Sequence, residues 1–262
     1  MIQFDNHTIS AITYSGHTII KVYGGCSEYP IWEATPPQPT EWKLKMDFTD
    51  GRSAYLPCDS TSAITSAEVQ TNHVAYEDGN AYYERLSAMT SVTIGSCVTL
   101  IGTSAFKGLT NLQRVFSYGE NVEEIGLYAF SGCTNLSSIY IGCSTKIIGA
   151  EAFRGCTSVS AINICAGVET IGMAAFMGVS SFSGTLTIPA TVTTIGNQAF
   201  YGMTNTTRFN VNPSTPPSLN NNNYAFHLNA STPTSAPIYV KTLSTYRTAT
   251  GWREYVNNLQ QL

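Results

Sequence analysis

The chain has 262 residues, of which only 11% are charged, and its 13 basic and 17 acidic side chains leave a net charge of −4. This balance excludes the usual kind of nucleic-acid-binding protein, because it provides no basic field to condense on a phosphate backbone. No apolar run of eighteen residues occurs, so we expect no insertion into a membrane.

Residues 1–33 are predicted to form short β-hairpins. "ITYSG" and "KVYGG" share a Tyr-x-Gly ending, and glycines placed in this way join short strands. The amino terminus lacks the basic and apolar regions of a secretory signal, so we expect a chain that is not exported by the usual route. A Pro-rich linker is expected at 34–40.

Residues 41–97 are predicted to form a β-rich N-terminal cap. Trp42, Leu44, Met46 and Phe48 alternate strictly with polar residues, as in a strand with one buried face. The "TDGR" that follows predicts a turn into a second strand. We expect this segment to cover the first of the repeats that come next.

An eight-residue motif recurs five times between residues 98 and 211. Its copies are "IGTSAFKG" from Ile101, "IGLYAFSG" from Ile125, "IGAEAFRG" from Ile148, "IGMAAFMG" from Ile171 and "IGNQAFYG" from Ile195. A period of 23 or 24 residues is typical of leucine-rich-repeat solenoids. Alternating runs such as "SSIYI" predict one strand per coil, and the "AF" segments close the coils with a stacked aromatic spine. The spine residues are Phe106, Phe130, Phe153, Phe176 and Phe200.

The predicted fold class is an α/β repeat solenoid, a leucine-rich-repeat array of about five coils with a β-rich start and a strand-helix cap. We expect the repeats at 98–211, an irregular Asn- and Pro-rich loop at 212–237 and the C-terminal cap at 238–262. In the cap, a strand at 238–240 precedes a helix whose apolar residues recur at i, i+3 and i+4. These are Tyr246, Ala249, Trp252, Tyr255, Val256 and Leu259.

The repeat consensus V-x-x-I-G-x-x-A-F-x-G-C-T-N-L-x-x-I-x-I resembles the BspA-type leucine-rich repeat. That family is common in surface proteins of gut and oral bacteria and in their phages, and the resemblance implies a binding or adhesion module. The segment 1–33, with its "YGG" and "IWE", resembles the front of tail-associated proteins in phages and prophages of gut bacteria. This second resemblance implies contacts with other virion proteins through residues 1–33.

The sequence predicts no catalytic site, no metal site and no cofactor. Its four histidines show no metal-ligand spacing, and the signatures of serine hydrolases and of nucleotide sites do not occur. A polysaccharide-active enzyme with paired carboxylates is the alternative. Glu151 and Glu169, however, belong to different repeat positions and show no such pairing.

Seven cysteines, an odd number, argue against a disulfide framework. Cys133 and Cys156 occupy one place in consecutive coils, and Cys143 and Cys165 nearly do. Two interpretations are open: a redox pair or soft-metal ladder, or small buried apolar side chains stacked by the repeat. Leu109, Val179 and Met203 occupy the first of these positions in the other coils. We favour burial, since these equivalents are apolar.

Strand residues next to the apolar ones are predicted to form an outward sheet face, the usual interaction surface of a solenoid. The candidate binding surface comprises Arg114, Phe116, Ser138, Tyr140, Asn163, Thr187, Arg208 and Asn210. Its mixed polar and aromatic side chains suit a host-surface protein or glycan better than a small charged metabolite. The alternative is a face that is merely solvated.

Two binding functions compete. One is a bacterial cell-surface adhesin, which the repeat family favours, and the other is a virion component of a phage or prophage tail that recognises a host surface. The missing signal and the expected reduced cysteines favour assembly in the bacterial cytoplasm. We therefore expect a host-recognition protein located in the virion, with the bacterial cell surface as the alternative location.

Overall fold

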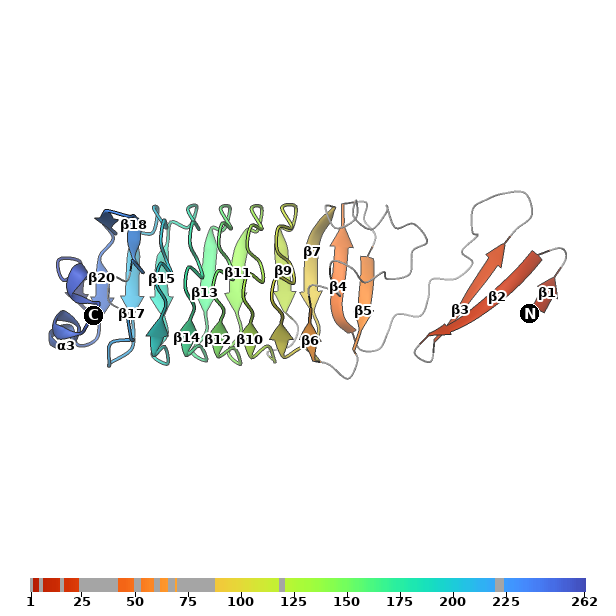
Figure 1. The fold of residues 1–262 in the computed structure, drawn as a ribbon, viewed down its shortest axis with the longest axis horizontal. Helices are drawn as coiled ribbons and strands as arrows, with labels where there is room; N and C mark the ends of the chain where they lie inside the picture. Colours follow the sequence, from red (N-terminus) through yellow and green to blue (C-terminus); the bar gives the residue numbers. More distant parts are fainter. Residues whose placement is uncertain are drawn as a thin grey trace. The chain divides into compact units, whose positions relative to one another are not determined.

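The structure is a computed structural model that describes residues 2–4, 7–14, 17–23, 42–49, 53–58, 62–65, 69, 88–117, 121–219 and 224–262. The chain divides into two compact units, Met1–Thr40 and Glu41–Leu262. The first unit contains an antiparallel sheet of β1 (Ile2–Phe4), β2 (His7–Tyr14) and β3 (His17–Tyr23) (Figure 1). Antiparallel strands are what the repeated Tyr-x-Gly ending predicts. The predicted linker at 34–40 lies outside the described residues.

The second unit is a β-solenoid whose coils each contain a long strand, a short strand and a return segment (Figure 1). The long strands are β9 (Arg114–Ser117), β11 (Ser138–Ile141), β13 (Ala161–Ile164), β15 (Thr185–Ile188) and β17 (Arg208–Val211). The short strands are β6 (Ala63–Ile64), β8 (Leu100–Ile101), β10 (Glu124–Ile125), β12 (Ile147–Ile148), β14 (Thr170–Ile171) and β16 (Thr194–Ile195). The short strands form one parallel sheet of six. The predicted repeat array is therefore confirmed.

Three antiparallel strands precede the first long strand of the repeats: β4 (Trp42–Phe48), β5 (Ser53–Pro57) and β7 (Met89–Ile94). β7 then pairs in parallel with β9, which joins this sheet to the coils. Leu44 and Met46 are buried, as their alternation predicts. Lys43 departs from that alternation, because it is fully buried and its Nζ donates to the Ala63 carbonyl at 3.0 Å.

The predicted phenylalanine spine fills the interior of the solenoid. From Phe106 to Phe200 the successive rings stack with centroids 4.9, 5.3, 5.4 and 5.6 Å apart and nearly parallel planes. Phe226 extends the stack at 5.3 Å from Phe200. Because equivalent side chains from neighbouring coils contact one another, stacking buries a continuous core that no single coil contains.

The two glycines of each coil serve different physical needs. At Gly149 an added Cβ would lie 2.6 Å from the Gly126 carbonyl carbon, so this position keeps neighbouring backbones in close approach. At Gly155 the backbone has φ +72°, and nothing lies closer than 4.0 Å to an added Cβ. Here glycine is required by the left-handed backbone conformation and not by a lack of space.

The return segments, such as residues 128–132, are joined by backbone hydrogen bonds that run in one direction. The N–H groups of Phe130 and Gly132 donate to the carbonyls of Ala152 and Arg154 in the next coil, each at 2.7 Å. Equivalent bonds leave the spine phenylalanine of every coil from Phe106 to Phe200. On this side of the solenoid, the N–H groups that link coils therefore point toward the C-terminal end.

The segment predicted as an irregular loop, 212–237, contains ordered structure. β18 (His227–Asn229) and β19 (Thr232–Pro233) pair antiparallel within it. Ala225 and Phe226 are buried and complete one more return segment, since the Phe200 N–H donates to the Ala225 carbonyl at 2.8 Å. The "AF" dipeptide keeps its place in the core although the glycines of the motif are missing around it.

The C-terminal cap differs from the predicted strand and helix. After β20 (Ile238–Val240) come a short helix α3 (Leu243–Thr248), a 3-10 turn η1 (Arg253–Tyr255) and a strand β21 (Leu259–Gln261), which extends the sheet beyond β20. Gly251, at φ +80°, packs closely against Leu219, so the chain turns where a helix was expected. Helix is thus minor among the described residues, and the "α/β" class is better stated as a β-solenoid.

Three aromatic side chains of the cap are fully buried and hydrogen-bonded. The Tyr246 hydroxyl donates to the Pro213 carbonyl at 2.8 Å, and the Trp252 indole N–H donates to the Pro217 carbonyl at 2.9 Å. The Tyr255 hydroxyl accepts the Phe226 N–H at 3.3 Å. These groups close the C-terminal end of the core, whereas Val256, another apolar residue of the predicted helix, is exposed.

Candidate functional site

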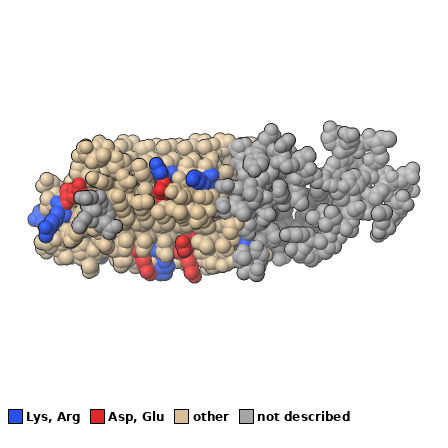
Figure 2. Space-filling model, in the orientation of Figure 1, with Lys and Arg blue, Asp and Glu red and all other residues tan. Residues whose placement is uncertain are grey.

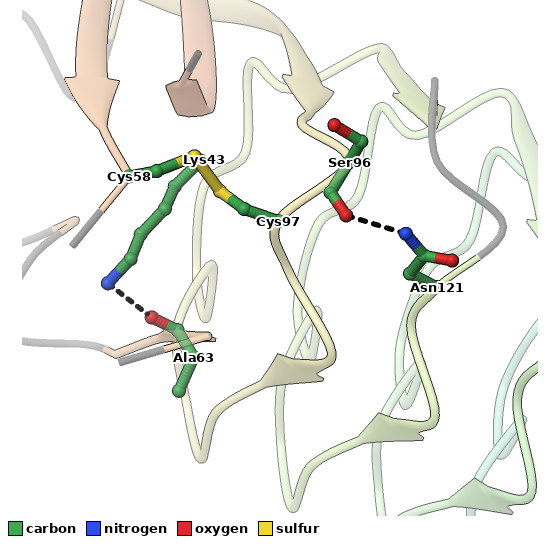
Figure 3. The surroundings of a disulfide bond; sticks show 6 residues. All are labelled: Lys43, Cys58, Ala63, Ser96, Cys97 and Asn121. Carbon is green, nitrogen blue, oxygen red and sulfur yellow. Dashed lines mark hydrogen bonds between the residues drawn. A yellow bond between two sulfur atoms is a disulfide. The ribbon is translucent and has the colours of Figure 1, made fainter. Parts of the chain in front are cut away.

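Four of the described cysteines form two disulfides, so the prediction of reduced cysteines is wrong. Cys58 and Cys97, with Cα atoms 6.4 Å apart, join the end of β5 to the turn after β7. Figure 3 shows this disulfide beside the buried Lys43 side chain. Cys143 and Cys165, with Cα atoms 4.8 Å apart, join the turns that follow β11 and β13. Both separations suit disulfide geometry.

Cys133 and Cys156 are buried free thiols, as predicted. Each thiol donates to a spine carbonyl of the preceding coil: Cys133 to Phe106 at 3.1 Å and Cys156 to Phe130 at 3.2 Å. Burial raises the pKa of Cys133 far above its ordinary value and that of Cys156 to about 12. A neutral, enclosed thiol is a poor nucleophile and a poor metal ligand, so these cysteines are structural.

The outward face of the long strands collects all eight predicted site residues. Ile139, Leu186 and Phe209 point into the core, and the residues on either side of them point out. Arg114, Phe116, Ser138, Tyr140, Asn163 and Thr187 are exposed, and Arg208 and Asn210 are half-buried. The coil geometry therefore places these side chains on one surface, which is the condition for a shared binding site.

Two rows of side chains cross this face. The aromatic row contains Phe116, Tyr140, Asn163, Thr187, Asn210 and Tyr239, and the arginine row contains Arg114, Ser138, Ala161, Thr185 and Arg208. Tyr239 was missed at the sequence level because its strand was assigned to the cap. The signal was available, since its neighbours Ile238 and Val240 are both apolar and both buried.

The ends of the two rows carry the largest side chains. Phe116 is 45% exposed and Tyr140 is 59% exposed, although apolar rings of this size are ordinarily buried. At the other end, the Arg208 guanidinium lies 3.6 Å from the centroid of the Tyr239 ring, which is a cation–π contact. Arg208 Nε also donates to Asn210 Oδ1 at 2.5 Å. This cluster is therefore held in a defined geometry.

Carboxylates lie mainly on other sides of the coil. Glu151 is buried in the return segment and pairs with Arg154, and its hydrogen bond with Tyr128 raises the pKa of that hydroxyl. Glu169 adjoins the short strand β14 and pairs with Lys146 at 3.6 Å. Each of the two glutamates considered for a glycosidase pair thus forms an ion pair with a basic residue, and the two lie on different sides of the coil. Figure 2 shows how sparse charged side chains are on the visible face of the coils.

Metal-binding clusters and membrane-spanning helices do not occur in the described part of the chain. No group of three or more His, Cys, Asp or Glu side chains there has an arrangement that could hold a metal ion. The described helices also include none that combines the length and apolar character needed to cross a membrane.

A solenoid of parallel two- and four-residue strands around stacked phenylalanines defines a leucine-rich-repeat protein. The sequence matches the BspA type leucine rich repeat region in 6 copies, over residues 78–207 and 170–246. This match covers more than half of the chain, which therefore belongs to the BspA-type leucine-rich-repeat family. Family and fold together define a binding or adhesion module. No curated protein is significantly similar to the chain in sequence.

Several solved structures resemble the chain. A leucine rich repeat protein of T. pallidum is 28% identical, with 46% of this chain and 58% of that chain covered and a TM-score of 0.44. A leucine rich cell surface protein of Faecalibacterium prausnitzii is 19% identical, with 80% and 72% covered and a TM-score of 0.41. A leucine-rich repeat protein of Bacteroides ovatus is 17% identical, with 92% and 71% covered and a TM-score of 0.34.

Proposed function

We propose that the chain is a non-catalytic binding module that recognises a protein or glycan on a host surface through the outward face of its long strands. The observation that carries this proposal is the exposure of Phe116 and Tyr140, which occupy equivalent outward positions on the consecutive long strands β9 and β11. Neither ring contributes to the core, and contiguous exposed aromatic side chains are typical of interaction surfaces. The eight residues of the predicted surface supply the polar contacts around this pair.

The disulfides alter the choice between the two settings considered from the sequence. Disulfides persist in oxidising surroundings and are rare in the cytosol. Cys58–Cys97 and Cys143–Cys165 therefore support a protein that works outside the cytoplasm, and they remove one reason for preferring cytoplasmic assembly. We therefore propose that the protein acts at the bacterial cell surface, as an adhesin.

A phage or prophage tail protein is the second candidate. The observation that favours it is the separate compact unit Met1–Thr40 with its own three-stranded sheet, which suits an attachment end. Antibody labelling separates the two settings. A surface adhesin is labelled on intact source cells, whereas a tail protein is labelled only on particles released by lysis.

The binding function is tested with the purified full chain on fixed epithelial and bacterial cells, by flow cytometry. The double variant Phe116→Ala/Tyr140→Ala is expected to lose about tenfold or more in apparent affinity, since buried aromatic anchors dominate interfaces. Met173→Ala removes another exposed apolar side chain, 50% exposed next to the short strand β14, and serves as the matched control. Unchanged binding by the double variant would refute the assignment of this face.

A further inference from the structure

We infer that the ligand of the outward face is an acidic glycan, an extended polysaccharide that bears carboxylates. This inference rests on the function proposed above and names the chemistry of its ligand. It follows from three properties of the face: the sign of its charge, the distance between its charged groups and the distribution of apolar and polar side chains across it.

The first property is a local excess of positive charge. The outward positions from β9 to β17 contain two charged residues, Arg114 and Arg208, and both are positive, although the whole chain has a net charge of −4. Arg114 forms no ion pair with any residue that the structure describes. On β4, which β7 separates from β9, Asp47 pairs with Lys45 at 2.9 Å. The face therefore attracts anions.

The second property is the distance between the two arginines. They belong to the same row and are separated by four strand steps, a span of roughly 20 Å at the usual strand spacing. A single small anion does not reach both guanidinium groups. An extended polymer with repeated carboxylates does, and guanidinium and carboxylate form strong charge-assisted hydrogen bonds.

The third property is the order of apolar and polar side chains. Protein interfaces have an apolar centre and a polar rim. Here the centre consists of short side chains on β13 and β15, Ala161, Asn163, Thr185 and Thr187, all exposed. The aromatic rings stand at the two ends of the row instead. Short amides and hydroxyls suit sugar hydroxyl groups, and flanking rings suit the apolar faces of pyranoses, so a glycan fits better than a folded protein.

The experiment compares three acidic polysaccharides, polygalacturonate, polymannuronate and hyaluronate, each with its methyl-esterified form. Binding to the immobilised full chain is measured by biolayer interferometry. At least one acidic form is expected to bind about tenfold or more tightly than its neutral ester, since bonds to charged groups are the stronger ones. Added salt is expected to weaken only the acidic form, because exposed charges are screened.

Variants then localise the effect. Arg114→Gln is expected to reduce binding of the acidic form about tenfold and to reduce binding of the ester much less. Arg208→Lys keeps the charge but loses the guanidinium contact with the Tyr239 ring, so a smaller loss is expected. Lys146→Gln removes one exposed positive charge on the short-strand side, away from the outward face, and is the matched control, with no loss expected.

The outcomes separate this inference from the proposed function. If none of the three acidic glycans binds, or if acid and ester bind equally, the inference is overturned. If cell binding still depends on Phe116 and Tyr140 in that case, the binding function stands with a different ligand. Loss of cell binding after protease treatment of the cells, with no glycan bound, identifies a protein ligand. A chain that binds neither cells nor glycans overturns both proposals.

Discussion

Replacing one glycine at a time by alanine separates the two roles that glycine has in each coil. In Gly155→Ala the new methyl group meets no atom closer than 4.0 Å, and only the left-handed backbone at φ +72° opposes the change. In Gly149→Ala the methyl group would lie 2.6 to 2.8 Å from three backbone atoms of Gly126 and Ile125. Backbone atoms cannot rotate away as the end of a side chain does, so the coils must separate.

The expected losses in the free energy of unfolding differ accordingly. A left-handed alanine costs about 1 to 2 kcal/mol, which is the expectation for Gly155→Ala. Overpacking against backbone costs up to about 3 kcal/mol. Separation also weakens the hydrogen bond from the Gly149 N–H to the Ile125 carbonyl, now 2.7 Å long, for about 1 kcal/mol more. Gly149→Ala is therefore expected to lose about 4 kcal/mol in total.

Urea unfolding followed by far-ultraviolet circular dichroism measures both losses. Ala161→Ser, at an exposed position of β13, is the control and is expected to stay within about 0.5 kcal/mol of the parent chain. Equal losses for the two glycine variants, or a larger loss for Gly155→Ala, would refute the distinction between close approach and backbone conformation.

Three other predictions concern the cysteines and the cap. The free energy of unfolding is expected to fall between about pH 9 and pH 12, because unfolded thiols ionise there while burial holds the pKa of Cys156 at about 12. In urea titrations at several pH values, Cys156→Ala should show a shallower fall than the parent chain. An equal dependence of the free energy of unfolding on pH in the two chains would contradict this. The free energy of unfolding of Cys143→Ser/Cys165→Ser in non-reducing urea is expected to be about 3 kcal/mol lower than that of the parent chain. A reductant should abolish this difference between the two chains. If the disulfide does not form, the difference is absent without reductant as well. Tyr255→Phe removes the acceptor of the Phe226 N–H and should cost about 1 to 3 kcal/mol, with faster amide exchange at Phe226; unchanged exchange there would show that another group accepts this bond.

The sequence was sufficient to predict the repeat architecture because the same physical constraint recurs in every coil. Glycines such as Gly149 occupy places where a methyl group meets backbone, and phenylalanines such as Phe153 contact their equivalents in both neighbouring coils. A period enforced by contacts between equivalent residues is visible without any structure. The direction of the side chains around Ile139 followed from strand alternation for the same reason.

Features that occur once in the chain were harder to predict. Cys143 and Cys165 are 22 residues apart, one residue short of the repeat, so their pairing depends on turn geometry that no pattern reports. The helix expected to contain Tyr246 through Leu259 ends at Thr248, because the chain turns at Gly251, which packs against Leu219 from a distant part of the chain. Lys43 can be buried because the Ala63 carbonyl of β6 accepts a hydrogen bond from its Nζ. In each case a long-range contact overrides the local pattern.

The one-way hydrogen bonds of the return segments make the two ends of the solenoid chemically different. On the return-segment side the C-terminal end presents donors, and the Tyr255 hydroxyl supplies an acceptor to one of them, the Phe226 N–H. The opposite end presents carbonyls on this side and needs donors there. The two caps are therefore not interchangeable. Duplication or deletion of a whole coil, by contrast, leaves the hydrogen-bonding groups at both ends of the solenoid unchanged. Gene-level change in coil number is thus the least disruptive way for this protein to lengthen or shorten its outward face during evolution.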